Sequence, residues 1–319
     1  MSPAQSALFP AAEQAATQFD VLTLMLWICG VMYLVVLLFV ALAIWRGARA
    51  RAAADSPVTE AADPTLSRAL AIWSCVVVLG LTALVVGSFF ADRSLAAARD
   101  RETLVIRATG QQWWWRFAYR TPGGAWVETA NELHLPAGRT ARVEVGSTDV
   151  IHSFWAPPLA GKMDVIPGHA NVLDLTPQRI GWYRGTCGEF CGLQHAHMAF
   201  DVRVESPADF DRWLAAQATP AAPQSGDPSV ARGQVVVTQG QCAECHTIRG
   251  TAAAGKAGPD LTHIGSRRSI AAGTLPMSRG GLEGWIEQPA ALKPGTNMPA
   301  VSLSPSDADA ASAYLLSLK

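Results

Sequence analysis

Two long apolar runs near the N-terminus constrain this chain more than any other feature of its sequence. Residues 21–45 and 69–91 contain no Asp, Glu, Lys or Arg, and each is about as long as a bilayer-spanning helix. Buried core helices are the alternative, and two uncharged runs of this length argue against it. We therefore expect a transmembrane helical hairpin within residues 21–91.

The segments around the two runs predict which side of the membrane each part occupies. The short connecting loop holds four Arg, and the positive-inside rule places such a loop in the cytoplasm. An external N-terminal tail, residues 1–20, and everything after about residue 91 then lie outside. The tail contains no Lys or Arg, so it lacks the basic start of a cleaved secretory signal.

Charge and cysteine content narrow the class of protein. The net charge is −1, which gives no reason to expect a basic face for nucleic acid. Four of the six cysteines form two close pairs, Cys187 with Cys191 and Cys242 with Cys245. In an exported domain such pairs form disulfides, or they hold a metal or a haem.

Residues 92–217 predict an all-β domain. Apolar and polar residues alternate over residues 141–145 and 198–204, and Pro/Gly clusters separate the runs. A period of two is typical of antiparallel strands with one wet face. We expect a compact β-sandwich or a Greek-key barrel.

A linker and a small all-α domain complete the chain. Residues 218–229 are rich in Ala, Pro and Ser and lack large apolar side chains, as a linker does. Within residues 230–319, Ser304, Pro305 and Asp307 predict the start of the last helix, because they supply a cap, a first-turn proline and an early acid. The core of this domain is small, so a buried cofactor would help it fold.

The run TCGEFCGLQHAHM, residues 186–198, has the spacing of a metal site. Cys187, Cys191, His195 and Met198 follow one another at intervals of four, four and three residues. Soft thiolate and thioether ligands suit copper, and imidazole suits it too. A single blue-copper site needs one Cys, so two Cys suggest two coppers bridged by both sulfurs, a pair that shares one electron.

A second His ligand and a carbonyl complete the predicted site. His152, after an alternating strand, is the best candidate for the second imidazole, and the backbone carbonyl of Glu189 lies between the two thiols in sequence. A disulfide and a zinc site are the alternatives, although Met198 counts against zinc. His197 is interpreted as a bystander, and His134 and His169 as surface or hydrogen-bonding residues.

The copper run resembles the C-x-E-x-C-G-x-x-H-x-x-M signature of the cytochrome c oxidase subunit II family. Residues 110–115, GQQWWW, resemble the aromatic run of that family, with Gln111 where His is usual. Residues 149–153 and 162–168, DVIHS and KMDVIPG, are also similar to it. The resemblance covers about residues 20–217 and implies a copper-A domain of cupredoxin-like fold after two membrane helices.

The resemblance also implies roles for single residues. Trp113 occupies the position through which electrons reach copper, as an exposed indole near the metal, whereas Trp115 is expected in the core. The carboxylate of Glu189 is expected to reach a magnesium site shared with the catalytic subunit, and Asp164 to lie near that interface. Leu70 stands where the family often has a Glu for a proton channel, so protons enter elsewhere or another subunit supplies the acid.

The run CAECH, residues 242–246, is the attachment motif of a c-type haem. Cys242 and Cys245 would bind the haem covalently, and His246 would be the proximal iron ligand. A redox-active CxxC is the alternative, disfavoured by His246 and by the lack of a βαβ pattern. Met298, on a Pro/Gly loop, is the favoured sixth ligand, with Met277 as its rival.

The C-terminal segment resembles a class I cytochrome c over about residues 228–319. Residues 258–267, GPDLTHIGSR, are similar to a stretch of that family, and Met298 matches its N-M-P loop. The resemblance implies that the carbonyl of Pro259 holds the N–H of the proximal imidazole. His263 is not at a ligand position of the family.

Together these features predict subunit II of a proton-translocating haem-copper cytochrome c oxidase in a bacterial inner membrane, with both C-terminal domains on the periplasmic side. Electrons would pass from its own haem through the copper pair to catalytic subunit I, which reduces O2. The expected partners are the other oxidase subunits, the membrane and an electron donor, either cytochrome c or cytochrome c reductase. Service to a nitrogen-oxide reductase is the alternative, and a copper-delivery protein, which has no use for covalent haem, is less favoured.

Overall fold

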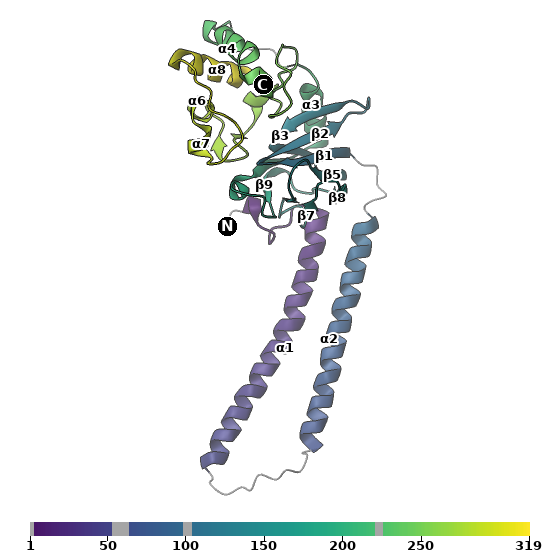
Figure 1. Cartoon of the computed structure of the whole chain (residues 1–319). Coiled ribbons are helices and arrows are strands. Elements are labelled where there is room, and N and C mark those ends of the chain that lie inside the picture. Colours follow the sequence, from purple (N-terminus) through teal and green to yellow (C-terminus); the bar gives the residue numbers. More distant parts are fainter. Residues whose placement is uncertain (1–2, 53–63, 98–103, 221–225) are drawn as a thin grey trace. The chain divides into compact units, whose positions relative to one another are not determined.

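The computed structural model describes residues 3–52, 64–97, 104–220 and 226–319. The chain forms two compact units, one of residues 1–15 with 100–319 and the other of residues 16–99 (Figure 1). Of the Arg-rich loop predicted between the apolar runs, residues 46–68, residues 53–63 lie outside the described residues and the remainder is helical.

The second unit is built from two long helices, α1 (Glu13–Ala52) and α2 (Pro64–Ala97). Both are long and apolar enough to cross a membrane, and large apolar side chains are exposed along them. The helices approach each other at small residues, since a Cβ on Gly87 would lie 2.8 Å from Leu24 Cδ2. Contact with lipid along the uncharged middle of both helices accounts for this exposure.

Both helices are longer than the predicted 21–45 and 69–91. The prediction of a tail over residues 1–20 is wrong from Glu13 onward, where α1 begins. The apolar runs mark only the uncharged middle of each helix, and polar flanking turns continue the backbone hydrogen-bond ladder. Ahead of α1 lies a short 3-10 helix, η1 (Pro3–Gln5), and Ala11 N then donates to the carbonyl of Pro158 at 2.7 Å.

The β domain consists of two five-stranded sheets, ordered β3-β2-β1-β5-β8 and β4-β10-β9-β6-β7. The strands are β1 (Leu104–Gln111), β2 (Trp114–Arg120), β3 (Trp126–Ala130), β4 (Glu132–Pro136), β5 (Ala141–Ser147), β6 (His152–Trp155), β7 (Met163–Val165), β8 (Asn171–Leu175), β9 (Gly181–Cys187) and β10 (Ala199–Glu205). The predicted β class and the cupredoxin-like layout are confirmed.

Two details of the β prediction are wrong. The pairs β1–β5 and β10–β4 are parallel, whereas only antiparallel pairs were expected. Strand β10 also lacks the predicted wet face, because Asp201 and Glu205 are buried. Both carboxylates accept hydrogen bonds there, from Ser269 and His134, and so remain satisfied inside the protein.

The core between the sheets is aromatic. Trp115, Phe117, Phe154 and Phe200 are fully buried, and Phe154 stacks on Phe200 with ring centroids 4.9 Å apart. Trp115 therefore packs in the core, as the sequence predicts. This core extends to Cys187, Cys191 and Met198 of the predicted copper site. The loop that carries these three predicted ligands thus rests on a well-packed scaffold.

Helix α3 (Pro207–Gln217) closes the β domain and was not predicted. Ser206 caps it by accepting from Asp209 N at 3.1 Å, and Phe210 packs against Tyr119 of the core. The chain then enters the helical domain at α4 (Pro228–Gln239), so the predicted linker of residues 218–229 ends two residues early.

The C-terminal domain contains five α-helices among its described residues, together with a β pair of two residues per strand. They are α4, α5 (Cys242–Cys245), α6 (Arg279–Glu287), α7 (Pro289–Leu292), α8 (Pro305–Ser317), β11 (Ser269–Ile270) and β12 (Leu275–Pro276). The predicted helix start is confirmed, because Ser304 accepts from Asp307 N at 3.1 Å. The short 3-10 helices η3 (His195–His197) and η4 (Ile264–Ser266) lie in the copper loop and in this domain.

Candidate functional site

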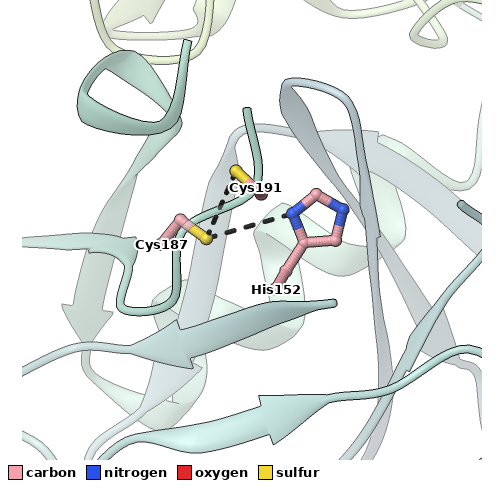
Figure 2. Close-up of side chains that lie close together, drawn as sticks. All are labelled: His152, Cys187 and Cys191. Carbon is pink, nitrogen blue, oxygen red and sulfur yellow. Dashed lines mark hydrogen bonds between the residues drawn. The ribbon is translucent and has the colours of Figure 1, made fainter. Parts of the chain in front are cut away.

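Three predicted ligands meet at one end of the β domain (Figure 2). Cys187 ends β9, Cys191 follows in the next loop, and their Sγ atoms lie 3.8 Å apart without a bond between them. His152 begins β6, and its Nδ1 lies 3.9 Å from Cys187 Sγ. The pairing of β6 with β9 brings this distant histidine to the thiols.

The remaining predicted ligands surround the same two sulfurs. His195 Nδ1 and Met198 Sδ lie 3.7 Å and 3.8 Å from Cys191 Sγ. The carbonyl oxygen of Glu189 lies 3.2 Å from Cys187 Sγ. Two buried thiols flanked by two imidazoles, a thioether and a carbonyl form a soft donor set that fits copper.

Asp149 holds His152 in the orientation that a metal ligand needs, and sequence reasoning missed this role. Its Oδ1 lies 2.8 Å from Nε2 of His152, which leaves Nδ1 to face the thiols. Gly110 makes room for the imidazole, since a Cβ there would lie 2.8 Å from His152 Cδ2. An acid three residues before a candidate His ligand was the available signal.

The site lowers the proton affinity of one thiol. A hydrogen bond with Cys191, together with His152 and backbone groups, outweighs burial and lowers the pKa of Cys187 to about 3. The hydrogen bond with Cys187 and burial, together with the negative charge of Cys187, raise the pKa of Cys191. Hydrogen bonds to Cys187 and Asp149 outweigh burial and raise the pKa of His152. The surroundings of Cys187 therefore favour its thiolate, which is the form that binds metal.

Trp113 lies against the loop of residues 187–198, which carries most of the predicted copper ligands. Its side chain is half-buried, whereas the sequence predicted an exposed indole. Its Nε1 donates to the carbonyl of Cys191 at 2.9 Å, and Gln112 Nε2 donates to the same oxygen at 2.8 Å. Gly192, at φ +113°, lies against the indole and turns the loop after Cys191. The Trp113 indole is thus hydrogen-bonded to the backbone of Cys191, whose thiol is one of the two in the predicted copper site.

Four further residues singled out from the sequence differ in their exposure and in their polar partners. The carboxylate of Glu189 pairs with Lys162 Nζ at 3.1 Å, and Asp164 lies 3.7 Å from the same ammonium. His169 is exposed, as expected. His134 is buried and hydrogen-bonds through both ring nitrogens, to Glu132 and Glu205.

A second site lies in the C-terminal domain as a cleft of about 330 Å³. Cys242, Cys245 and His246 line it together with Pro259. His246 Nδ1 lies 2.8 Å from the carbonyl oxygen of Pro259, and burial lowers the pKa of His246, so Nε2 is the ring nitrogen left for an iron. Gly258 is required here, because a Cβ would lie 2.5 Å from His246 Cε1.

The rest of the cleft also fits a haem. Met298 lines it, whereas Met277 is not among the lining residues and packs against the core of the domain. Arg267 lines the cleft with its buried Nε lacking a hydrogen-bond partner among the described atoms, which suits an acidic group on an occupant. Gln111–Trp114 and Asp149 of the β domain form part of the same wall.

Comparisons with known proteins agree with both sites. The family described as the periplasmic domain of cytochrome c oxidase subunit II matches residues 121–205, and the cytochrome c family matches residues 230–319. Cytochrome c oxidase subunit 2 of Alkalihalophilus pseudofirmus is 32% identical over 322 residues, which cover 98% of this chain and 91% of that protein. Subunit 2 of Bacillus sp. strain PS3 is 30% identical over 266 residues, covering 78% and 73%.

Solved structures of similar sequence include a periplasmic domain. The periplasmic domain of cytochrome oxidase subunit II from Bradyrhizobium japonicum is 32% identical and covers 37% of this chain and 95% of that chain. Its TM-score is 0.35, which adds nothing to the fold assignment. The two family matches fall on the domain with the thiol cluster and on the domain with the cleft.

Proposed function

Because the chain belongs to the cytochrome c oxidase subunit II family and ends in a cytochrome c domain, we propose that it relays electrons within a haem-copper oxidase. The proposed route runs from its own c-type haem through a binuclear copper centre to the catalytic subunit that reduces O2 to water. The proximity of both thiols, both imidazoles, the thioether and the Glu189 carbonyl carries this proposal.

Each residue of the copper site has a proposed part in holding the metal. Cys187, Cys191, His152, His195 and Met198, together with the Glu189 carbonyl, would hold two coppers. When bound, such a pair supplies a one-electron couple whose charge is shared by both metals, which keeps structural rearrangement small. The core around Cys187, Cys191 and Met198 excludes water from the site.

The haem cleft has a parallel assignment. Cys242 and Cys245 would hold the haem covalently, and His246 and Met298 would ligate its iron. The Pro259 carbonyl orients His246 by accepting from its Nδ1–H. Trp113 lines the cleft and bonds to Cys191, so its indole is the proposed entry point for electrons into the copper site.

The finer expectations about partners belong to the same proposal. The soluble domains would face the periplasm of a bacterial inner membrane, with subunit I, other subunits and an outside donor as partners. The carboxylate of Glu189 is 45% exposed and is open to a magnesium ion shared with subunit I once its pair with Lys162 breaks. Leu70 carries no acid, so the proton route would lie in another subunit or elsewhere.

Time-resolved absorption of the full chain loaded with both cofactors tests the relay. After light-triggered reduction of the haem, we expect its reoxidation and the reduction of copper to share one rate constant. A His152→Ala variant, which lacks a terminal copper ligand, is the control and should keep the haem reduced. A wild-type haem that stays reduced beside intact copper would contradict the proposed relay.

A further inference from the structure

The loop that carries Met298 is anchored by a buried lysine. Nζ of Lys293 donates to the carbonyl oxygens of Trp113 at 2.9 Å, His197 at 3.0 Å and Ala271 at 3.3 Å. Trp113 and His197 belong to the β domain, whereas Ala271 belongs to the helical domain. Lys293 is only 3% exposed, so this ammonium is enclosed by carbonyls from both domains.

Two side-chain amides extend this anchor along the same loop. Asn297 Nδ2 donates to the carbonyl of Gln112 at 2.8 Å. Gln194 Nε2, from the copper loop, donates to the carbonyl of Pro294 at 2.5 Å. Each of the two domains therefore donates a side-chain hydrogen bond to a backbone carbonyl of the other domain.

The burial of Lys293 has a physical consequence. Enclosing an ammonium costs free energy unless hydrogen bonds replace its water, and no ion pair of Lys293 occurs among the described residues. Burial lowers the pKa of Lys293 to about 8. If the domains separated, the ammonium would return to water and the carbonyls of Trp113 and His197 would lose their donor. The enclosed position therefore exists only while the two domains are in contact.

The anchor is connected to the copper site through one residue. The carbonyl of Trp113 accepts from Lys293, while the indole Nε1 of Trp113 donates to the carbonyl of Cys191 at 2.9 Å. Lys293, Trp113 and Met298 all line the haem cleft. A displacement of Lys293 would therefore move the Met298 loop relative to the indole.

Building on the proposed function, we infer that Lys293 is a positioning residue that locks the haem domain onto the copper loop, with the cleft facing Trp113. Free partners that meet through surface charges dock transiently, and salt screens those charges. Contacts between a buried ammonium and carbonyls are screened far less. Electron exchange between the two centres should accordingly be insensitive to salt in this chain.

A distance measurement in the assembled oxidase tests this role without relying on turnover. Pulsed EPR between the oxidised haem and the copper pair should give one narrow distance distribution in the wild type. Lys293→Met keeps the length of the side chain and removes its donors, so we expect a broadened distribution. The rate of haem-to-copper transfer should fall about tenfold and become dependent on salt.

Two control variants define the specificity of the effect. Lys319→Met removes an exposed ammonium from the same domain and should leave the distribution narrow. Arg116→Gln removes an exposed hydrogen bond of 3.0 Å to the carbonyl of Lys256. This variant should broaden the distance distribution less than Lys293→Met does. If the Lys293 variant does not accumulate, Asn297→Ala replaces it, because the hydrogen bond of Asn297 is exposed and its loss should not prevent folding. A distance distribution that is not broadened in Asn297→Ala then counts against the inference.

The outcomes separate the inference from the function on which it rests. Broadening with an unchanged haem potential and retained Met298 ligation supports the lock. A distribution that stays narrow in Lys293→Met, or that broadens only in molecules without Met298 ligation, overturns it. A narrow wild-type distribution without electron transfer would instead reject the relay and leave the lock in place.

Discussion

The proposed copper site and the haem cleft differ in how much of each site the side chains of the protein fill. The proposed copper ligands lie against a filled aromatic core, and each of their ligand atoms is within 4 Å of a thiol sulfur. The haem site is a cleft of about 330 Å³ whose wall includes core residues such as Ile264 and Leu315. On the proposed assignment, copper would join a scaffold that is already packed, whereas haem would complete the core of its domain.

Loss of covalent haem should give the largest effect. In the Cys242→Ala/Cys245→Ala double variant, the cleft of about 330 Å³ would lose its covalently held occupant, and its apolar wall would be left to water. Because the core of this domain is small and domains are typically stable by only about 5–15 kcal/mol, the helical domain should unfold while the β domain stays folded. Hydrogen exchange resolved by segment would measure this. If both domains of the double variant were equally protected from hydrogen exchange, the proposed difference between the two sites would be wrong.

The buried cluster around His134 tests whether the β scaffold is stabilised by its own polar contacts. Replacing His134 by Gln leaves Glu132 and Glu205 with a weaker partner, which we expect to cost about 3 kcal/mol of unfolding free energy. His169→Gln, on an exposed loop, is the matched control. Denaturant unfolding followed by Trp fluorescence would measure both, and equal stabilities would refute the role of the cluster.

The same cluster predicts a pH window for the stability of the β domain. Burial opposes the charge of both groups, but their mutual hydrogen bonds raise the pKa of His134 and lower that of Glu132. The contribution of His134 is full below its unfolded pKa of 6.5 and is lost as pH rises through the raised folded value. That of Glu132 is full above 4.5 and is lost as pH falls through the lowered value.

Both contributions of this cluster are therefore full between pH 4.5 and 6.5. We expect the unfolding free energy of the wild type to fall on either side of this window. His134→Gln should show a flatter dependence, and a wild-type curve that rises steadily above pH 6.5 would contradict the assignment.

Asp149 tests how much of the copper affinity comes from orientation of a ligand. In Asp149→Asn the contact at 2.8 Å loses its negative charge, and we expect copper affinity to fall about 10–100-fold with the fold intact. Asp211→Asn, an exposed carboxylate paired with Arg139, should leave affinity unchanged. Competition with a copper chelator measures both variants. Equal affinities would mean that the scaffold orients His152 without its acid.

Met298 gives the smallest expected effect on stability. Met298→Leu conserves volume and should cost less than about 1.5 kcal/mol, yet it should shift the haem potential within the roughly 0.8 V range that axial ligands control. Met277→Leu is the matched control, because Met277 does not line the cleft. Redox titration would measure both, and a shift in the Met277 variant alone would reverse the axial assignment.

The sequence predicted the cluster of proposed copper ligands but missed the contacts between the two domains. Cys187 to Met198 lie in one loop, so their spacing alone indicated a metal site, and His152 was added from the end of a strand. The contact between Lys293 and Trp113 joins residues 180 positions apart, and no sequence pattern marks it. Asp149 was visible only as a residue near a candidate His. Its role depends on a turn whose geometry the sequence does not display.

Some misses had a readable signal. Ser206, Pro207 and Asp209 repeat the pattern that correctly predicted the last helix at Ser304, and they start α3. Interpreting residues 92–217 as strands alone hid this signal. The burial of Asp201 and Glu205 was unpredictable in another way, because alternation in one strand does not reveal what covers its second face.

Metal analysis and EPR of the full chain test the central claim most directly, which is that one polypeptide holds a copper pair and a haem. We predict two coppers and one covalent haem per chain, with a mixed-valence copper signal in which one electron is shared by two nuclei. A single zinc, or a Cys187–Cys191 disulfide in protein that takes up no copper, would contradict the account.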